Sequence, residues 1–304
     1  MRRGVGAARF LRGLSGPRGS SCDTLRPAGR GTERARSAGR VTQLMTLSGR
    51  RALVSGGAGH IGLVVGETLM ELGAMVAVLD LEAKACRQRA GLLSRDRAGR
   101  ALPVVCDLRD ESATRRAVRA TIARMGGLDI LIHTAAYVGT TQVDGWASPF
   151  ERQTVQAWDA AMRVNLTSAF VMVQEAREAL AQSGHGSVIF LSSIYGVVGP
   201  DPRLYAQSDL ANPAGYGASK GGLLQLMRYL ATTLAPRVRV NAVSPGGVWR
   251  HQPEAFVQRY LARTPLGRMA TEEDVKGAVA YLASDLSAYV TGHNLVVDGG
   301  WTAW

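Results

Sequence analysis

From residue 50 onward, short apolar runs rich in β-branched residues alternate with segments of helical periodicity. The runs cover 51–56, 74–80, 101–107, 128–136, 186–193, 238–245 and 294–300, and the helical segments cover 59–73, 81–94, 111–126, 154–182, 213–235, 253–263 and 271–284. Strands that read as continuous apolar runs are buried on both faces, as in parallel sheets with helical crossovers. Since such crossovers are nearly always right-handed, the pattern predicts an α/β fold with a single doubly wound Rossmann-type parallel sheet and helices on both faces.

The beginning of the chain has a different composition. Residues 1–44 contain ten arginines, one aspartate and one glutamate, a net charge of +8 within the +12 of the whole chain. We expect residues 1–45 to be a disordered basic N-terminal extension and residues 46–304 to be a single domain. Three interpretations of the extension stay open: a start codon assigned upstream of Met45, an organellar targeting segment, or a tail with another role.

The remainder of the chain carries an ordinary +4, so the basicity belongs to the extension and we expect no nucleic-acid partner. No apolar run reaches the roughly 18 residues of a membrane-spanning helix, and we expect no membrane association. The three scattered cysteines form no metal-ligand pattern, so no metal is expected, and they favour a reducing compartment. Together these observations predict a cytoplasmic protein.

A glycine-rich turn joins the first predicted strand to the first predicted helix. In "SGGAGHIG", Gly56, Gly59 and Gly62 recur at every third position, and His60 and Ile61 open the helix. A tight turn at the first glycine and close backbone approach at the second place a pyrophosphate against the helix N-terminus, whose free N–H groups favour anions. The position of the motif between strand and helix predicts a dinucleotide-binding loop.

An aspartate ends each of the next two strands. Asp80 lies 24 positions after Gly56, where a carboxylate accepts hydrogen bonds from both adenosine ribose hydroxyls and repels a 2′-phosphate. Because no arginine lies within 52–62 to receive that phosphate, we expect NAD rather than NADP. Asp107, followed by Leu108, is a candidate contact for the adenine edge, and helix capping is an equal alternative for Asp107.

Lysine is scarce in this chain, with three lysines against 33 arginines, yet Lys220 follows Tyr216 by four positions. That spacing puts both side chains on one helix face. A free tyrosine, with a pKa of about 10, is a poor base at neutral pH, and a nearby cation favours its phenolate form. A compact ammonium suits this role better than a planar guanidinium. The pair therefore predicts a proton-transferring tyrosine whose pKa is lowered by lysine.

Two further polar sites fall near this pair. Ser192 and Ser193 end the fifth strand, at the edge where α/β sheets bind ligands, and a hydroxyl there can donate to a substrate oxygen as charge develops. Asn165 lies inside the long helical segment 154–182, where asparagine is mildly unfavourable, which suggests a structural or functional role.

In this order, the motifs resemble those of the short-chain dehydrogenase/reductase family. The resemblance covers residues 46–304 and rests on "SGGAGHIG", "CDL", "HTAA", "VNL", "SSIYG", "YGASK", "NAVSPGG" and "VTGHNLVVDGG". It implies a catalytic tetrad in which Tyr216 exchanges the proton, Ser193 steadies the oxygen, Lys220 tunes Tyr216 and binds the nicotinamide ribose, and Asn165 holds a relay water. Ser193 is preferred to Ser192 because the serine of the family precedes x-x-Gly.

The resemblance also implies cofactor contacts from Ala135, Pro245, Gly246 and Val248, beside those of the glycine turn, Asp80, Asp107, Leu108, Tyr216 and Lys220. The chain departs from the family pattern at His60, which stands at the position of the usual middle glycine, and at "HTAA", where the family has Asn-Asn-Ala-Gly. These departures bear on the pyrophosphate contacts and on the surroundings of the nicotinamide. None removes a proton-transfer group.

A narrower resemblance links "SSIYGVVGPD", "TPLGRMA" and "VVDGGWTAW" to the flagellin-modification and surface-polysaccharide branch of the family. The stretch between Ser193 and Tyr216 is longer than is usual in the family. It includes the polar segment 199–215, which we expect to border the substrate pocket with side chains suited to hydroxyl-rich ligands: Asp201, Arg203, Tyr205, Gln207 and Asp209. Arg250 is a candidate contact for a phosphate or carboxylate.

These observations predict an NAD(H)-dependent oxidoreductase that interconverts a secondary alcohol and a ketone on a small-molecule substrate, a sugar or sugar phosphate. The alternatives are a 3-oxoacyl or generic ketone reductase and, in another class, a non-catalytic NAD-binding sensor or scaffold. The resemblance further implies a homotetramer or homodimer.

Overall fold

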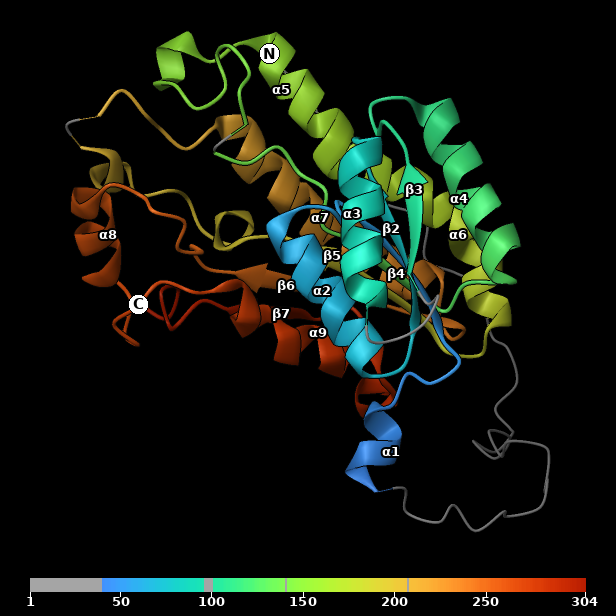
Figure 1. The fold of residues 1–304 in the computed structure, drawn as a ribbon. Coiled ribbons are helices and arrows are strands. Elements are labelled where there is room, and N and C mark those ends of the chain that lie inside the picture. Colours follow the sequence, from blue (N-terminus) through green and yellow to red (C-terminus); the bar gives the residue numbers. More distant parts are fainter. Residues whose placement is uncertain (1–39, 96–100, 140, 207) are drawn as a thin grey trace, which may run out of the picture. The chain divides into compact units, whose positions relative to one another are not determined.

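In the part of the chain that the structure describes, seven parallel strands form one sheet in the order β3-β2-β1-β4-β5-β6-β7 (Figure 1). The structure is a computed structural model that describes residues 40–95, 101–139, 141–206 and 208–304. The strands are β1 (Arg51–Ser55), β2 (Met75–Asp80), β3 (Ala101–Val105), β4 (Ile130–His133), β5 (Gly186–Leu191), β6 (Val238–Pro245) and β7 (Asn294–Val297). The predicted doubly wound parallel sheet is confirmed.

Helices connect these strands on both faces of the sheet. They are α1 (Val41–Met45), α2 (His60–Glu71), α3 (Ala83–Ser94), α4 (Glu111–Met125), α5 (Val155–Met162), α6 (Ser168–Gln182), α7 (Ala214–Thr233), α8 (Glu254–Leu261) and α9 (Lys276–Ala283). Their ends follow ordinary capping chemistry: the Asp110 carboxylate accepts from the Ala113 amide at the start of α4, and Gly126 ends that helix in the left-handed conformation.

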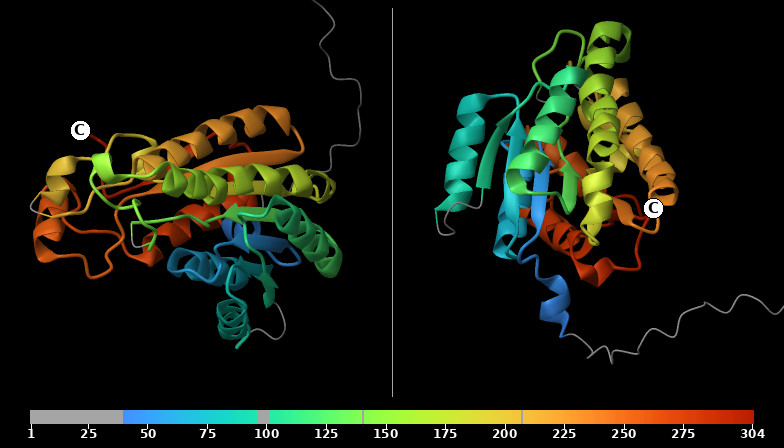
Figure 2. Two further views of the ribbon diagram at one scale, coloured as in Figure 1. Left: turned by 90° about the horizontal axis from the view of Figure 1, so that it is seen from above. Right: turned by 90° about the vertical axis from the view of Figure 1, so that its right-hand side faces the viewer.

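The apolar core lies in two layers, one on each face of the sheet. Helices α4, α6 and α7 cover one face of the sheet, and helices α2, α3 and α9 cover the other (Figure 2). The alternation of a β-strand assigns the residues of β1 to these layers, because Leu53 joins the first while Ala52 and Val54 join the second. Burial on both faces explains the continuous apolar runs in the sequence.

The segment predicted as one helix over 154–182 is interrupted. Between α5 and α6, the residues Arg163–Thr167 form a π-helical turn, η2, with Asn165 buried at its centre. A π-turn accommodates an extra residue without a break in direction, so apolar periodicity on either side continues. Such turns are frequent at functional sites, and this one places Asn165 directly beneath the end of β4.

The chain from Gly39 to Trp304 forms one compact unit. The disorder expected of residues 1–45 is wrong for their last five, which form α1 and contact the 3-10 turn η6 (Asp285–Ser287). Residues 1–39 lie outside the described residues. Among the described helices, none combines the length and the apolar character that crossing a bilayer requires.

The strand order reverses between β1 and β4, which are adjacent in the sheet although β2 and β3 separate them in the chain. In open α/β sheets, ligands bind outside the carboxyl ends of the strands at such a point. Ser55, His133 and Leu191 end the three strands β1, β4 and β5 at this place. The residues predicted as a catalytic site follow these strand ends.

Candidate active site

The turn between β1 and α2 requires glycine at two positions for reasons internal to the fold. Gly56 has a φ of +66°, and a Cβ there would lie 2.6 Å from the backbone nitrogen of Ala135; a Cβ on Gly62 would lie 2.1 Å from the Gly56 carbonyl oxygen. Gly59, the N-cap of α2, is less constrained, because a Cβ there would meet only the Gly56 oxygen at 3.2 Å. The turn thus leaves Gly59 open to solvent. His60 is exposed, and Ile61 packs against the core.

Asp80 ends β2 beside this turn. One carboxylate oxygen accepts from the Ala58 amide at 3.0 Å and the other from the Leu81 amide at 2.7 Å, so the half-buried carboxylate fixes the turn. A guanidinium also reaches this place, since Arg89 on α3 donates from Nε to the Ala58 carbonyl oxygen at 3.3 Å. The segment 52–62 itself contains no arginine, and Arg89 reaches it from α3. Two opposite charges therefore lie at the end of β2: the Asp80 carboxylate, which favours NAD, and the Arg89 guanidinium, which would favour NADP.

The Asp107 carboxylate is held by the guanidinium of Arg109 and accepts from the backbone amide of Arg109. These contacts, the side-chain hydrogen bond most of all, hold the pKa of Asp107 below its ordinary value. The side chain of Leu108 is buried in the core, so only its backbone faces the turn. The capping of α4 falls to Asp110.

The other predicted cofactor contacts follow β4 and β6. Ala135 packs under Gly56, as its close approach to that glycine shows. Pro245 ends β6, the Gly246 amide donates to the Val297 carbonyl oxygen at 2.9 Å, and Val248 forms an isolated bridge with Ala270. All are positioned by backbone contacts at the carboxyl edge of the sheet.

Asn165 is completely buried in the π-turn, and its amide is fully engaged. Its Oδ1 accepts from the Tyr137 amide at 2.7 Å, and its Nδ2 donates to the Ser219 hydroxyl at 3.0 Å. Ser219 in turn donates to the Tyr216 carbonyl oxygen at 2.8 Å. The Asn165 side chain therefore connects the segment after β4 with the first turn of α7, which carries Tyr216.

The two serines after β5 have different partners. Ser192 Oγ donates to the carbonyl oxygen of Lys220 at 2.9 Å and so fastens the strand end to α7. Ser193 Oγ accepts from the Tyr195 amide at 3.1 Å and lies close enough to the Tyr216 side chain to lower its pKa. Gly196 belongs to the same turn, because a Cβ there would lie 2.8 Å from the Lys220 backbone. This arrangement explains the serine–x–x–glycine spacing and leaves Ser193 beside Tyr216.

Lys220 lies beneath Tyr216, as the i,i+4 spacing predicted. Its Nζ is 5.6 Å from the centroid of the Tyr216 ring and donates to the Leu191 carbonyl oxygen at 2.6 Å. The side chain is 97% buried, with a relative exposure of 3%. Burial disfavours the ammonium form and lowers the lysine pKa to about 7.

The expected depression of the Tyr216 pKa by Lys220 is not found in this structure. Burial of the hydroxyl raises the Tyr216 pKa, and the opposing effects come from the hydrogen bond to Ser193 and from the charge of Arg250. The physical reason is that Lys220 is itself desolvated, which weakens its hold on its own proton. In the structure described here, the tyrosine keeps its proton at neutral pH.

Arg250 lies in the segment after β6. Its Nε donates to Glu272 at 3.0 Å, and its backbone amide donates to the Gln252 side chain at 2.7 Å. The next residue, His251, has a φ of 57° and lies against Trp249, with ring centroids 4.2 Å apart. Arg250 is the cation named above whose charge acts to lower the Tyr216 pKa.

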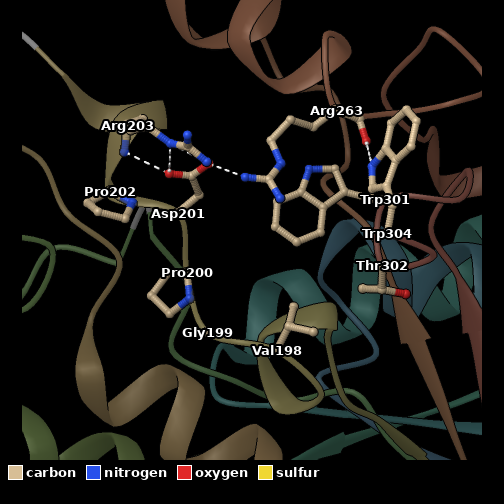
Figure 3. A pocket seen from close by; sticks show the side chains of 10 residues that line it. All are labelled: Val198, Gly199, Pro200, Asp201, Pro202, Arg203, Arg263, Trp301, Thr302 and Trp304. Carbon is tan, nitrogen blue, oxygen red and sulfur yellow. Dashed lines mark hydrogen bonds and ion pairs between the residues drawn. The ribbon is translucent and has the colours of Figure 1, made fainter.

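In the polar segment 199–215, where we expected side chains that contact the ligand, Asp201 and Tyr205 contact other protein side chains. Asp201 is buried and holds both Arg203 and Arg263, which keep its pKa well below the ordinary value (Figure 3). Tyr205 packs against Phe256, with ring centroids 5.5 Å apart, and Asp209 is exposed. Gln207 lies outside the described residues. The buried acid fastens the segment to Arg263, two positions after the end of α8, and it also lines a cavity.

Two cavities border this segment. One of about 420 Å³ lies between Asp201, Arg263 and the C-terminal residues Trp301 and Trp304 (Figure 3). The other, of about 360 Å³, lies between Tyr195 and the first turns of α7 at Ala214 and Gly217. Neither is lined by Ser193 or Tyr216, and only the second includes chain neighbours of Tyr216, at Gly217 and Ala218.

Sequence reasoning missed three contributors to the site: Arg89, Ser219 and the Leu191 carbonyl group. Ser219 carried a signal in hindsight, because it lies three positions after Tyr216 inside "YGASK". Arg89 and Leu191 carried none, since their contacts depend on how α3 and β5 pack. Among the described residues, no cluster of three or more His, Cys, Asp or Glu side chains is placed to hold a metal ion.

Known proteins resemble this chain over most of its length. A family model described as enoyl-(acyl carrier protein) reductase matches residues 56–302. The cis-4-hydroxycyclohexanecarboxylate dehydrogenase of Sinomonas cyclohexanicum is 34% identical over 84% of this chain and 97% of its own. The D-threitol dehydrogenase of Mycolicibacterium smegmatis is 30% identical over 84% of this chain and 93% of its own.

Solved structures agree with these relatives. A short-chain dehydrogenase from Leptospira borgpetersenii with bound NAD⁺ superposes with a TM-score of 0.73 and 30% identity, covering 87% of this chain and 96% of its own. A gluconate 5-dehydrogenase from Burkholderia cenocepacia, in complex with NADP and tartrate, gives 0.74 and 28%, covering 87% and 100%. With the parallel sheet and the strand-end residues described above, these matches show that the chain belongs to the short-chain dehydrogenase/reductase family and is an oxidoreductase that acts on CH–OH groups.

Proposed function

We propose that the protein is an NAD(H)-dependent oxidoreductase that interconverts a secondary alcohol and a ketone on a hydroxyl-rich substrate, a sugar or sugar phosphate, with Asn165, Ser193, Tyr216 and Lys220 as catalytic residues. The observation that carries the proposal is the convergence of these four side chains at the ends of β4 and β5. Ser193 is close enough to Tyr216 to lower its pKa, Lys220 Nζ lies 5.6 Å from the centroid of the Tyr216 ring, and Asn165 reaches the Tyr216 backbone through Ser219.

The glycine turn fits a dinucleotide. Gly56 and Gly62 are required by their own backbone surroundings, whereas Gly59 is exposed at the N-terminus of α2, so a phosphate can approach its backbone. Asp80 would hold the adenosine ribose, and Lys220 the nicotinamide ribose. Bound at this edge, the cofactor would supply or accept the hydride, while the protein residues manage the proton and the oxygen.

The proton chemistry follows from the surroundings of Tyr216. Its hydroxyl keeps its proton at neutral pH, which suits donation to a carbonyl oxygen during ketone reduction. The Ser193 hydroxyl, oriented by the Tyr195 amide, donates to the same oxygen as negative charge develops. In the oxidation direction, Tyr216 must first lose its proton, so this direction requires alkaline conditions or an additional positive charge near the phenol.

The substrate proposal rests on two features. The relatives named above act on a cyclic hydroxy acid and on a polyol, and the charge of Arg250 acts on the Tyr216 hydroxyl. A hydroxylated substrate that carries a carboxylate or phosphate would place its anionic group at Arg250 and its reacting carbon at Tyr216. This chemistry agrees with the surface-polysaccharide branch suggested by the sequence, which also implies a homodimer or homotetramer.

A panel of sugars, sugar phosphates and hydroxy acids, assayed by absorbance with each of the four nicotinamide cofactors, tests the proposal. We expect turnover with NAD or NADH, and Tyr216→Phe lowers kcat by about a thousandfold or more while nucleotide binding is kept. Equal activity of Tyr216→Phe and the wild type would refute the catalytic assignment. Turnover of acyl thioesters with NADPH alone would favour a 3-oxoacyl reductase instead.

Asp80 tests the cofactor preference separately. In Asp80→Ser, the charge that repels a 2′-phosphate is removed while Arg89 stays in place, so the ratio of kcat/KM for NADPH to that for NADH rises. A wild-type protein that already prefers NADPH would show that Arg89 outweighs Asp80 and would overturn the NAD assignment. Arg116→Gln, at an exposed position of α4, serves as a charge-changing control.

A further inference from the structure

The ring of His133 lies in the middle of the molecule, between the cofactor turn and the π-turn. His133 ends β4 and is only 1% exposed. Its Nδ1 is 2.8 Å from the hydroxyl oxygen of Ser55, the last residue of β1, and its Nε2 is 3.2 Å from the main-chain carbonyl oxygen of Asn165. Both ring nitrogens are therefore occupied by protein atoms from two different elements.

These partners determine the tautomer. A carbonyl oxygen only accepts, so Nε2 must carry the hydrogen and donate to Asn165. In a neutral ring, Nδ1 is then the acceptor, and the Ser55 hydroxyl donates to it. Burial and the neighbouring charge of Lys220 lower the His133 pKa to about 3, so the ring is neutral at working pH. His133 therefore exchanges no proton with the substrate.

The segment that begins at His133 joins the two parts of the site. Thr134 donates to the Ser55 carbonyl oxygen from its amide at 3.1 Å and from its hydroxyl at 2.7 Å. Three residues later, the Tyr137 amide donates to Oδ1 of Asn165. Asn165 is thus held at its side chain by Tyr137 and Ser219 and at its carbonyl group by His133.

We propose that His133 is a positioning residue for Asn165: its Nε2–H holds the carbonyl group of the π-turn against the end of β4 and so keeps Tyr216, through Asn165 and Ser219, in line with the cofactor turn. A π-turn departs from the regular helical ladder and depends on outside contacts for its geometry. The His133 contact supplies such support at Asn165 itself. The inference goes beyond the proposed function, and only its kinetic test relies on that function.

Two amide variants separate the two ring contacts. Glutamine carries its terminal nitrogen the same number of bonds from Cα as Nε2 of histidine, and asparagine carries its terminal atoms the same number of bonds away as Nδ1. His133→Gln therefore keeps a donor for the Asn165 carbonyl, and His133→Asn keeps only a partner for Ser55. His133→Phe fills the space and removes both contacts, and His185→Gln, at an exposed turn, is the control.

We expect His133→Gln to stay within about threefold of wild-type kcat, and His133→Asn and His133→Phe to lose about tenfold, the factor for roughly one hydrogen bond. The KM for cofactor and the dissociation constant for nucleotide change by less than about threefold, because Thr134 still holds the Ser55 carbonyl oxygen at the start of the glycine turn. If His133→Phe fails to fold, the comparison of Gln with Asn still decides. Equal kcat for the two amide variants would overturn the inference.

A second measurement does not depend on activity. In ¹⁵N spectra of the holoprotein, the resonance that disappears in His133→Gln should show the neutral Nε2–H tautomer and should not titrate between about pH 5 and 9. A protonated ring or the Nδ1–H tautomer would contradict the assigned contacts, whether or not the proposed reaction is correct. Loss of turnover with every substrate, together with the expected spectrum, would instead count against the function alone.

Discussion

The most informative single property of the site is the direction in which the surroundings of Tyr216 shift its pKa. Burial raises this pKa, whereas Ser193 and Arg250 act against that rise. Removal of the Arg250 charge should therefore raise the pKa further. This effect should be visible in alcohol oxidation at alkaline pH, because oxidation requires the deprotonated phenol of Tyr216.

For the wild type, we expect kcat/KM for alcohol oxidation to increase with pH above neutrality as Tyr216 loses its proton. In Arg250→Gln, this rise should move to higher pH, and Glu272→Gln, which frees Arg250 from its carboxylate, should move it the opposite way. The measurement is a pH–rate profile with a neutral alcohol, so that binding of an anionic substrate does not interfere. A shift of the Arg250→Gln profile to lower pH would contradict the charge arrangement.

Lys220 gives a prediction about stability. Its pKa is about 7 in the folded protein, against the ordinary 10.5. Between these values the unfolded chain binds a proton that the folded chain lacks, so stability rises with pH across this window and the contribution is lost below pH 7. Relative to Lys220→Met, the wild type should gain on the order of 3 kcal/mol between pH 7 and about 9.5.

The measurement for Lys220 is denaturant unfolding without nucleotide at several pH values in this range. Lys84→Met, whose lysine belongs to the described part of α3, controls for the loss of a lysine as such. A constant difference between wild type and Lys220→Met across the range would show that the amine is not desolvated as described.

At the residue scale, the sequence identified the side chains but not their ionisation. Tyr216, Lys220, Ser193 and Asn165 were found from motif and spacing, and the structure brings them together. The direction of the Tyr216 pKa could not be predicted, because it depends on how deeply the hydroxyl is buried and on Arg250, which lies in a distant segment. For the same reason Arg89 escaped notice, since it reaches Ala58 only through the packing of α3.

At the element scale, the contact between the 3-10 turn η3 (Ile194–Gly196) and α7 holds Ser193 and Lys220 together. Gly196 lies so close to α7 that an added Cβ would be 2.7 Å from Ser192 Oγ and 2.8 Å from the Lys220 carbonyl oxygen. Because the second of these atoms is backbone, it cannot move aside by rotation. The glycine is required by space and not by its φ angle.

Gly196→Ala should therefore destabilise the protein by about 2 kcal/mol and lower kcat, because either η3 or α7 must shift. Gly199→Ala is the matched control, since nothing lies within 4 Å of a Cβ at that position, and its effect should stay within about 0.5 kcal/mol. Thermal unfolding and steady-state kinetics measure both changes. Equal melting temperatures for the two variants would show that η3 packs less closely against α7 than described.

Helix and strand positions followed from periodicity because buried parallel strands and their connecting helices have clear apolar patterns. The π-turn did not, since the apolar stripe continues from α5 into α6 and one extra residue leaves little trace in it. The weak signal was Asn165 itself, an unfavourable residue in a long helix. Its cause lies in the contacts with Tyr137, Ser219 and His133, which no local pattern contains.

At the scale of the whole molecule, the chain from Gly39 to Trp304 forms a single compact unit that contains all the proposed site residues. A protein that begins at Gly39 should therefore equal the full chain in kcat, in KM for nucleotide and in melting temperature. Retention on immobilised DNA or RNA, compared between the two proteins at matched salt, tests the expectation of no nucleic-acid partner. A loss of activity on removal of residues 1–38 would show that the unit is incomplete.

The strand order of the sheet is the property of the whole molecule that the sequence determined least directly. Alternating strands and helices indicated a doubly wound sheet, but the adjacency of β1 and β4 rests on the crossover rules and on the family resemblance. The sequence also predicted that segment 199–215 borders the substrate pocket with side chains suited to hydroxyl-rich ligands. In the structure, the Asp201 carboxylate pairs with Arg203 and Arg263, and the Tyr205 ring packs against Phe256.

The clasp of Asp201 by Arg203 and Arg263 has a mechanical consequence. Arg263 also stacks on Trp301, 4.8 Å from its ring centroid, and accepts at its carbonyl oxygen from Trp304. The loop after β5, the segment after α8 and the last residues of the chain are thereby linked by direct contacts. Any opening that admits a bulky substrate must move all three segments together or first break the ion pair of Asp201, whose side chain is almost completely buried.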